Sequence, residues 1–177
     1  PPETEAALRP WDMGDEHNVS IPLKDYIPCA LARLDAWVRR GESLNVTTVA
    51  DAGFFQNPLN EALFRGAFDG EAESYAREIF ARLAPLSPAA VYLCRESAGE
   101  AMRFAKLAKG PHWADGIDAL LDQPGMAALF ERRLALELKL LPLLPHVLCP
   151  VEGGDWSRAR AAIRKFIEDR GYAHGGA

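Results

Sequence analysis

The sequence predicts a helix-rich α/β protein in which helices cover both faces of a parallel sheet, giving a three-layer arrangement. Three short apolar segments are separated by segments with helical periodicity, and no hairpin turn joins any two of them. The chain has 177 residues, of which 49% are hydrophobic and 25% are charged, which is ordinary globular usage. We expect an irregular arm over residues 1–22, one domain over residues 23–170 and a frayed tail over residues 171–177.

The first half of the expected domain alternates between helix and strand. Apolar side chains recur at intervals of three and four over residues 25–40, where Gly41 ends the pattern, and they predict a helix. The β-branched segment over residues 45–53 predicts the first strand. Asn57 followed by Pro58 predicts the N-cap and first turn of the next helix. The order should therefore be helix, strand, turn and helix.

The second half continues this alternation and supplies two more strands. The predicted elements are a helix over 71–83, a strand over 89–94, a helix over 97–108 capped by Ser97 and Glu100, helices over 113–121 and 126–141, a strand over 146–150 and a helix over 156–170. Three strands are few for a sheet with so many helices around it, so we expect at least one central strand to be missing from this chain.

Charge, cysteine content and known motifs exclude several classes of protein. The net charge is −5 and the basic residues are scattered among acidic ones, which argues against a nucleic-acid polymer or a membrane as partner. The three cysteines form no CxxC pair, so we expect reduced thiols and no metal site. No apolar segment approaches the roughly 20 residues that cross a bilayer, and no signal-peptide pattern is present. We therefore expect a cytoplasmic protein with a small-molecule partner.

Candidate chemistry follows the first predicted strand, since ligands of open parallel sheets bind beyond the carboxyl ends of the strands. Asp51 ends that strand, and the next side chains combine flat apolar rings with amide groups: Phe54, Phe55, Gln56 and Asn57. A carboxylate in this position can accept a proton from a substrate hydroxyl. The alternative is structural, with Asp51 capping the turn and the two phenylalanines packed in the core.

Basic side chains follow the second predicted strand. Arg95 stands at its end, and Arg103, Lys106 and Lys109 recur every three residues on roughly one helical face. Such a face suits phosphate oxygens. The alternative is a solvated basic surface that nearby glutamates balance.

The segments TVADAGFFQNPLNEALFRG, VYLCRESAGEAMRFA and DWSRARAAIRKFIE carry a resemblance, most specifically at Phe55-Gln56-Asn57-Pro58. Over roughly residues 25–170 the chain resembles bacterial P-loop proteins that are distantly related to thymidylate and deoxynucleoside kinases. The resemblance implies a sheet of P-loop kinase type, with Asp51 as the catalytic residue, in the place of the acidic residue near the phosphoryl acceptor. It also implies substrate-binding residues and a lid over nucleotide phosphates: Phe54, Phe55, Gln56, Asn57 and Arg95 for substrate, and Arg103, Lys106 and Lys109 for the lid.

The resemblance implies a phosphotransferase that uses ATP and Mg²⁺ and acts on a small hydroxyl-bearing acceptor such as a nucleoside or nucleotide. That activity needs a Walker A loop, GxxxxGK[ST], and this chain contains no Gly-Lys dipeptide. Because the loop follows the first strand in the related proteins and this chain starts at Pro1, we expect an N-terminal strand, loop and helix to be missing. The alternative is a non-catalytic scaffold or interaction protein that has lost the ATP site. The sequence leaves open whether the apolar helix over 126–141 makes a homodimer.

Overall fold

The computed structural model describes residues 21–44, 47–95, 97–109, 116, 118–151 and 155–171. The chain divides into two compact units, unit 1 (Pro1–Pro88) and unit 2 (Ala89–Ala177). The predicted arm and tail lie, apart from their residues nearest the domain, outside the described part. The single domain predicted over residues 23–170 spans both units and stays a prediction.

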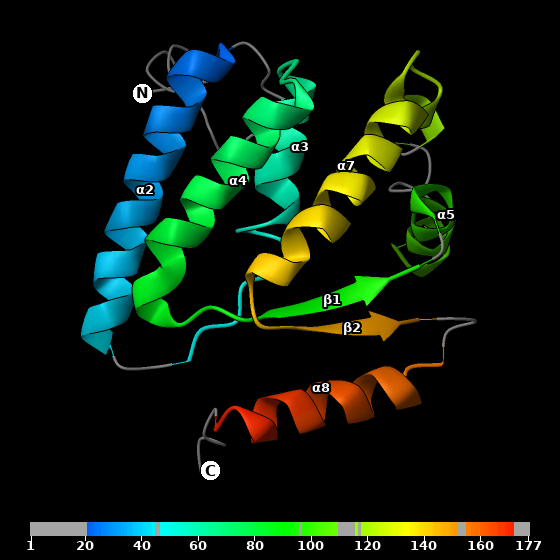
Figure 1. The fold of residues 1–177 in the computed structure, drawn as a ribbon. Coiled ribbons are helices and arrows are strands. Elements are labelled where there is room, and N and C mark those ends of the chain that lie inside the picture. The colour runs from blue at the N-terminus through cyan, green and yellow to red at the C-terminus, as the bar shows by residue number, and fades with distance from the viewer. Residues whose placement is uncertain are drawn as a thin grey trace, which may run out of the picture. The chain divides into compact units, whose positions relative to one another are not determined.

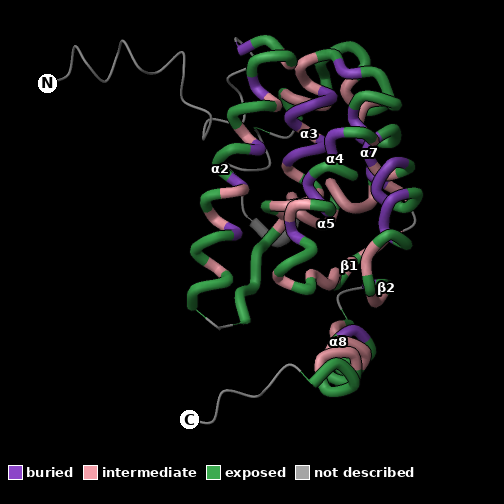
Figure 2. Tube along the Cα trace, turned by 60° about the vertical axis from the view of Figure 1, so that its left-hand side comes forward, coloured by how far each residue is buried: buried purple, intermediate pink, exposed green. Residues whose placement is uncertain are grey.

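The described part of unit 1 is helical. It contains α2 (Leu23–Leu44), α3 (Gln56–Phe64), α4 (Asp69–Leu83) and the short 3-10 helix η2 (Ala84–Leu86) (Figure 1). Both α2 and α3 contact α4, and buried positions recur at helical spacing along these helices (Figure 2). Leu59 and Ala72 at the centre of this packing are fully buried. The helices predicted over residues 25–40 and 71–83 are confirmed; α2 is longer at both ends, and α4 begins two residues earlier than predicted.

The first predicted strand is wrong in the residues that the structure describes. Residues 47–50 have no regular structure and are exposed, and residues 51–55 form bends and turns. Val49 is 91% exposed, so the β-branched side chains have no sheet face on which to pack. Strand preference is a preference for such packing rather than a property of the backbone alone, and the described residues provide no packing partner here.

The turn before α3 is organised by Ala52 rather than by Asn57. Ala52 has a positive φ of 56°, and its carbonyl accepts hydrogen bonds from the backbone N–H groups of Phe55 at 3.4 Å and Asn57 at 3.0 Å. The helix therefore begins at Gln56 with Phe55 as its N-cap residue. The predicted Asn57 cap is wrong by two positions, although Pro58 still falls in the first turn, where a proline costs no helical hydrogen bond.

Unit 2 contains a small parallel sheet. Strand β1 (Ala90–Cys94) pairs with β2 (His146–Pro150) so that Ala90 lies opposite His146 and Cys94 opposite Pro150. The other described elements of this unit are α5 (Ala98–Lys109), α7 (Met126–Leu140), the 3-10 helix η3 (Leu141–Leu143) and α8 (Ser157–Asp169). Both strands are confirmed. The protein is thus α/β and helix-rich with a parallel sheet, as predicted, but that sheet has two strands in the described residues rather than three.

Helices lie on both faces of this sheet (Figure 1). On one face, Tyr92 of β1 hydrogen-bonds to Glu137 of α7. On the other, Cys149 of β2 packs with Ala159 of α8 in a buried cluster. The Ser97 hydroxyl accepts a hydrogen bond of 3.1 Å from the Glu100 N–H, which confirms Ser97 as the predicted cap of α5, while the part predicted for the Glu100 side chain stays a prediction. Of the helix predicted over 113–121, residues 116 and 118–121 are described and are helical, and the other residues lie outside the described part.

A buried polar group ties α7 to the sheet. The Glu137 side chain is 3% exposed, its Oε1 lies 3.2 Å from Arg133 Nε, and its Oε2 accepts a hydrogen bond of 2.5 Å from the Tyr92 hydroxyl. Burial raises the pKa of the Glu137 carboxyl, while the Arg133 charge and the Tyr92 hydrogen bond act in the opposite direction. The folded protein therefore holds a proton on Glu137 more tightly than the unfolded chain does.

Glu137→Gln should change how stability depends on pH. A raised carboxyl pKa favours the folded state below the unfolded value, about 4.5, and this contribution is lost as pH rises through the folded pKa. Glutamine keeps an acceptor for Tyr92 and does not titrate. The unfolding free energy of the wild type should therefore fall relative to the variant between pH 4 and 8, by about 1.4 kcal/mol per unit of pKa shift. Urea unfolding of both proteins across this range checks it, and a constant difference or one of opposite sign would contradict it.

No helix within the described ranges is both long and apolar enough to span a bilayer.

Candidate functional site

A cavity of about 400 Å³ lies among the helices of unit 1. Side chains from α2, from the turn before α3, from α3 and from α4 form its wall: Tyr26, Ala30, Arg33, Leu34, Trp37, Gly53, Phe54, Asn57, Pro58, Glu61, Tyr75 and Ile79. The α2 members are spaced by three and four residues or adjacent, so they lie on one face of that helix. The helical periodicity of α2 thus builds both the core of unit 1 and one wall of the cavity.

Aromatic rings supply much of the wall. The ring centroids of Trp37 and Phe54 lie 4.5 Å apart with an interplanar angle of 51°, and those of Tyr26 and Tyr75 lie 6.4 Å apart in an edge-to-face arrangement. Rings of this size provide flat apolar surfaces with a defined orientation. A planar ligand can therefore find stacking partners in this cavity.

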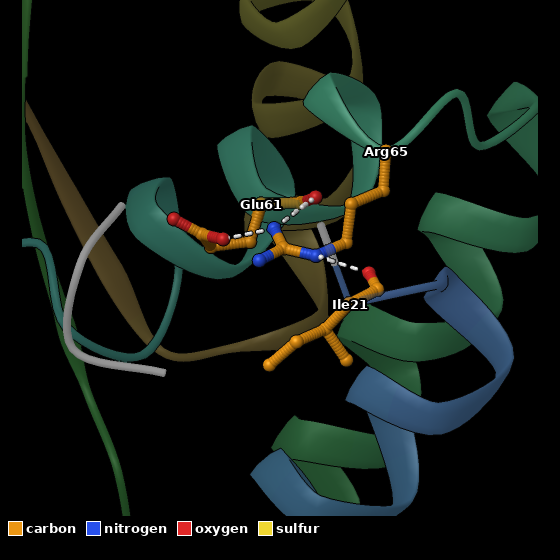
Figure 3. A network of polar contacts seen from close by, with 3 residues as sticks. All are labelled: Ile21, Glu61 and Arg65. Atoms are coloured by element: carbon orange, nitrogen blue, oxygen red, sulfur yellow. Dashed lines mark hydrogen bonds and ion pairs between the residues drawn. The ribbon is translucent and has the colours of Figure 1, made fainter. Parts of the chain in front are cut away.

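A buried ion pair fixes Glu61, the carboxylate of the wall as the described residues form it. Arg65 Nη1 donates hydrogen bonds to Glu61 Oε2 and, at 3.0 Å, to the Glu61 carbonyl (Figure 3). Arg65 Nε donates a hydrogen bond of 3.2 Å to the Ile21 carbonyl. The guanidinium carbon lies 4.1 Å from the centroid of the Tyr26 ring. The side chains of Arg65 and Glu61 are only 1% and 8% exposed. A buried guanidinium or carboxylate without its partner costs several kcal/mol of desolvation free energy, so separating Arg65 from Glu61 is unfavourable and the pair keeps this geometry.

Two buried hydroxyls stay protonated beside this pair. Burial raises the pKa of the Tyr26 hydroxyl, and the Glu61 charge raises it further. Burial also raises the pKa of the Tyr75 hydroxyl, and the neighbouring Tyr26 raises that pKa further. Both phenols are therefore neutral groups over the physiological range. Arg33, which is exposed, and Asn57 add a cation and an amide to the wall.

Of the residues predicted around the first strand, the structure brings two to the cavity. Phe54 and Asn57 belong to the wall. Phe55 instead packs on Phe80 of α4, with ring centroids 5.3 Å apart, while Asp51 and Gln56 are exposed. Among the described residues that form the wall, Asp51, Phe55 and Gln56 are not included. The catalytic role of Asp51 and the substrate roles of Phe55 and Gln56 stay predictions.

The predicted basic residues belong to unit 2, whereas the cavity belongs to unit 1. The Arg95 guanidinium stacks 3.7 Å from the Phe104 ring. Arg103 lies 3.8 Å from Glu100, and Lys106 pairs with Asp118. The side chain of Lys109 lies outside the described residues. Carboxylates thus balance two of these cations, as the alternative of a solvated surface expects, and the phosphate-binding role of the set stays a prediction.

The described residues contain no group of three or more His, Cys, Asp or Glu side chains that could hold a metal ion. Comparison with protein-family models, with curated proteins and with solved structures finds no match to this chain.

Sequence reasoning missed most of the wall. Tyr26, Trp37 and Tyr75 share the spacing of core residues on their helices, and Glu61 with Arg65 has the i, i+4 spacing of an ordinary surface ion pair. The one usable signal was that Glu61 and the C-cap residue Arg65 flank the apolar residues Ala62, Leu63 and Phe64 at the end of α3.

Proposed function

We propose that unit 1 binds a small molecule with a planar ring in the cavity between α2, α3 and α4. The observation that carries the proposal is the composition of the wall, which combines aromatic faces with a few polar groups that can fix orientation. Trp37 and Phe54 provide the faces, and Asn57 and Glu61 provide an amide and a carboxylate. Wall residues from three separate helices and a turn converge on one volume, as a ligand site requires.

In its finer form the proposal makes this molecule the acceptor of a phosphotransferase of P-loop kinase type, such as a nucleoside or nucleotide. Support comes from the segment that carries the resemblance, because Phe54, Asn57 and Pro58 belong to the cavity wall. Asp51 lies in the same turn and is exposed, which suits a group that meets a substrate hydroxyl. ATP and Mg²⁺ would need a Walker A loop, which this sequence does not contain.

A non-catalytic interaction protein built on the same fold is the second candidate. The lack of any Gly-Lys dipeptide favours it, since without that loop the backbone cannot wrap the phosphates of a nucleotide. Under this alternative the aromatic rings of unit 1 are packing residues and bind no small molecule.

Phe54→Ala should weaken nucleoside binding about tenfold or more. The substitution removes one of the two neighbouring, tilted rings of the wall, and the burial of an aromatic side chain is worth about 1.5–3 kcal/mol. Calorimetric titration of the chain with guanosine, adenosine, cytidine and thymidine measures the effect. Phe68→Ala is the matched control, since Phe68 is 78% exposed in the same unit and lies outside the cavity wall.

Two further results separate the candidates. Asp51→Asn should leave nucleoside affinity nearly unchanged, because Asp51 lies outside the wall. If no nucleoside binds at millimolar concentration, or if Phe54→Ala and Phe68→Ala act alike, the small-molecule proposal fails and the interaction protein is favoured.

A further inference from the structure

We infer that Arg33 makes the cavity of unit 1 select a planar ligand that carries an oxyanion, so that a nucleoside monophosphate binds better than the nucleoside. This inference rests on the proposed function, because it concerns the ligand of the same cavity. It assigns a specificity-determining residue, Arg33, and the charge class of the ligand.

Arg33 stands at the opening of the cavity. It belongs to the wall and is nevertheless exposed, so its side chain borders both the cavity and the solvent. Trp37, four residues later on α2, belongs to the same wall. Side chains at this spacing are neighbours on one helix face, with Cβ atoms about 6 Å apart. An anionic group attached to a ring beside Trp37 can therefore reach the Arg33 guanidinium.

The positive charge of Arg33 has no ion-pair partner among the residues that the structure describes. The wall also holds Glu61, but this carboxylate pairs with Arg65. The buried hydroxyls of Tyr26 and Tyr75 stay neutral. As the described residues form it, the wall thus presents an unbalanced cation to a ligand, and an anion is the group that balances it.

The charge of Arg33 also acts on a buried group of the cavity. Burial raises the pKa of the Tyr26 hydroxyl and the Glu61 charge raises it further, whereas the Arg33 charge lowers it. Arg33 therefore stabilises negative charge at the position of the Tyr26 oxygen. A ligand oxyanion held closer to the guanidinium gains more from the same attraction.

A guanidinium is suited to an oxyanion. Its planar fork of N–H donors matches two oxygens of a carboxylate or a phosphate at once, and hydrogen bonds between charged groups are shorter and stronger than neutral ones. A nucleoside offers hydroxyl groups in the same place and carries no charge. Because Arg33 is exposed, water and salt reduce the gain, so we expect a preference of about tenfold rather than several hundredfold.

Calorimetric titration of the chain with guanosine, adenosine, cytidine and thymidine, each beside its 5′-monophosphate, tests the inference. In about 50 mM salt the monophosphate should bind about tenfold tighter than its nucleoside, and in about 500 mM salt the ratio should fall to about threefold or less, because salt screens an exposed charge. Equal affinities at low salt, or a ratio that salt does not lower, would overturn the inference.

The 5′-carboxylic acid of the same nucleoside distinguishes the two sources of an oxyanion. Phosphate and carboxylate both fit the guanidinium fork. A gain of about tenfold over the nucleoside from either derivative supports the inference, and the larger of the two gains identifies the anion. No gain from either derivative would overturn it.

Arg33→Gln assigns the preference to this side chain. The ratio of monophosphate to nucleoside affinity should collapse to about twofold or less, whereas Arg33→Lys, which keeps the charge but not the fork, should retain part of it. The matched control is Arg39→Gln, since Arg39 is exposed on the same helix and lies outside the cavity wall, and it should leave the ratio unchanged. Equal ratios in the Arg33→Gln and Arg39→Gln variants would overturn the assignment.

The outcomes separate this inference from the proposed function. Nucleosides and monophosphates that bind with equal affinity, and whose binding Phe54→Ala weakens, would leave the proposed function standing and overturn the role of Arg33. Absence of binding by every nucleoside and every monophosphate would overturn the proposed function and the inference with it.

Discussion

Arg65→Met should lower the unfolding free energy of unit 1 by about 3–5 kcal/mol, because it leaves the Glu61 carboxylate buried without its guanidinium partner. The substitution also removes the donor to the Ile21 carbonyl and the contact with the Tyr26 ring. Methionine fills part of the same volume, so the loss reports mainly on charge and hydrogen bonding. Amide hydrogen exchange of α3 and α4 measures this unit separately from the rest of the chain.

The matched control for this prediction lies on α4. Arg77 forms an ion pair with Glu73 at the same i, i+4 spacing, but its side chain is 49% exposed. Arg77→Met should therefore cost less than about 1 kcal/mol. Combining Glu61→Gln with Arg65→Met should cost less than Arg65→Met alone, because no charge is then stranded. A loss from Arg65→Met no larger than that from Arg77→Met would show that the network does not hold unit 1 together.

Leu140→Ala should destabilise unit 2 by about 2–5 kcal/mol. Leu140 is fully buried at the end of α7, where the helix leads through η3 to β2. Removing its side chain leaves a void that the packed neighbours fill only in part. The lost burial of apolar surface and the remaining void both add to the loss of unfolding free energy. Hydrogen exchange of the β1 and β2 amides should accelerate accordingly.

The same helix supplies the comparison for this second prediction. Leu138 lies two residues earlier and is 46% exposed, so Leu138→Ala makes the same chemical change outside the core. It should change the unfolding free energy by no more than about 0.5 kcal/mol. Similar effects from the two leucines would mean that α7 packs through a different face from the one described.

The helices and strands of this chain were predictable where burial is periodic. The apolar spacing over residues 25–40 predicted α2, and the short apolar segment over 146–150 predicted β2 with its observed bounds. The segment over residues 45–53 misled, because β-branched residues favour a strand only where a sheet face is available to them. Where Val49 stands almost fully exposed, no such face contributes, and the turn centred on Ala52 forms instead.

The candidate site was predictable only where it is local in sequence. Phe54 and Asn57 follow one another closely and were recognised, but Tyr26, Trp37 and Tyr75 reach the cavity from other helices. Their spacing equals that of core residues, so the sequence alone does not separate a wall from a core. The contacts of Arg65 with residues of α2 and with the segment before it depend on packing that no local pattern encodes.

The most direct test of the account is an NMR titration of the chain with guanosine, following backbone amides and the indole N–H groups. We expect shifts that saturate with guanosine concentration and that concentrate at Arg33, Trp37, Phe54 and Asn57, which line the cavity. Shifts confined to residues of unit 2, or none at millimolar guanosine, would contradict the claim that unit 1 carries a ligand site.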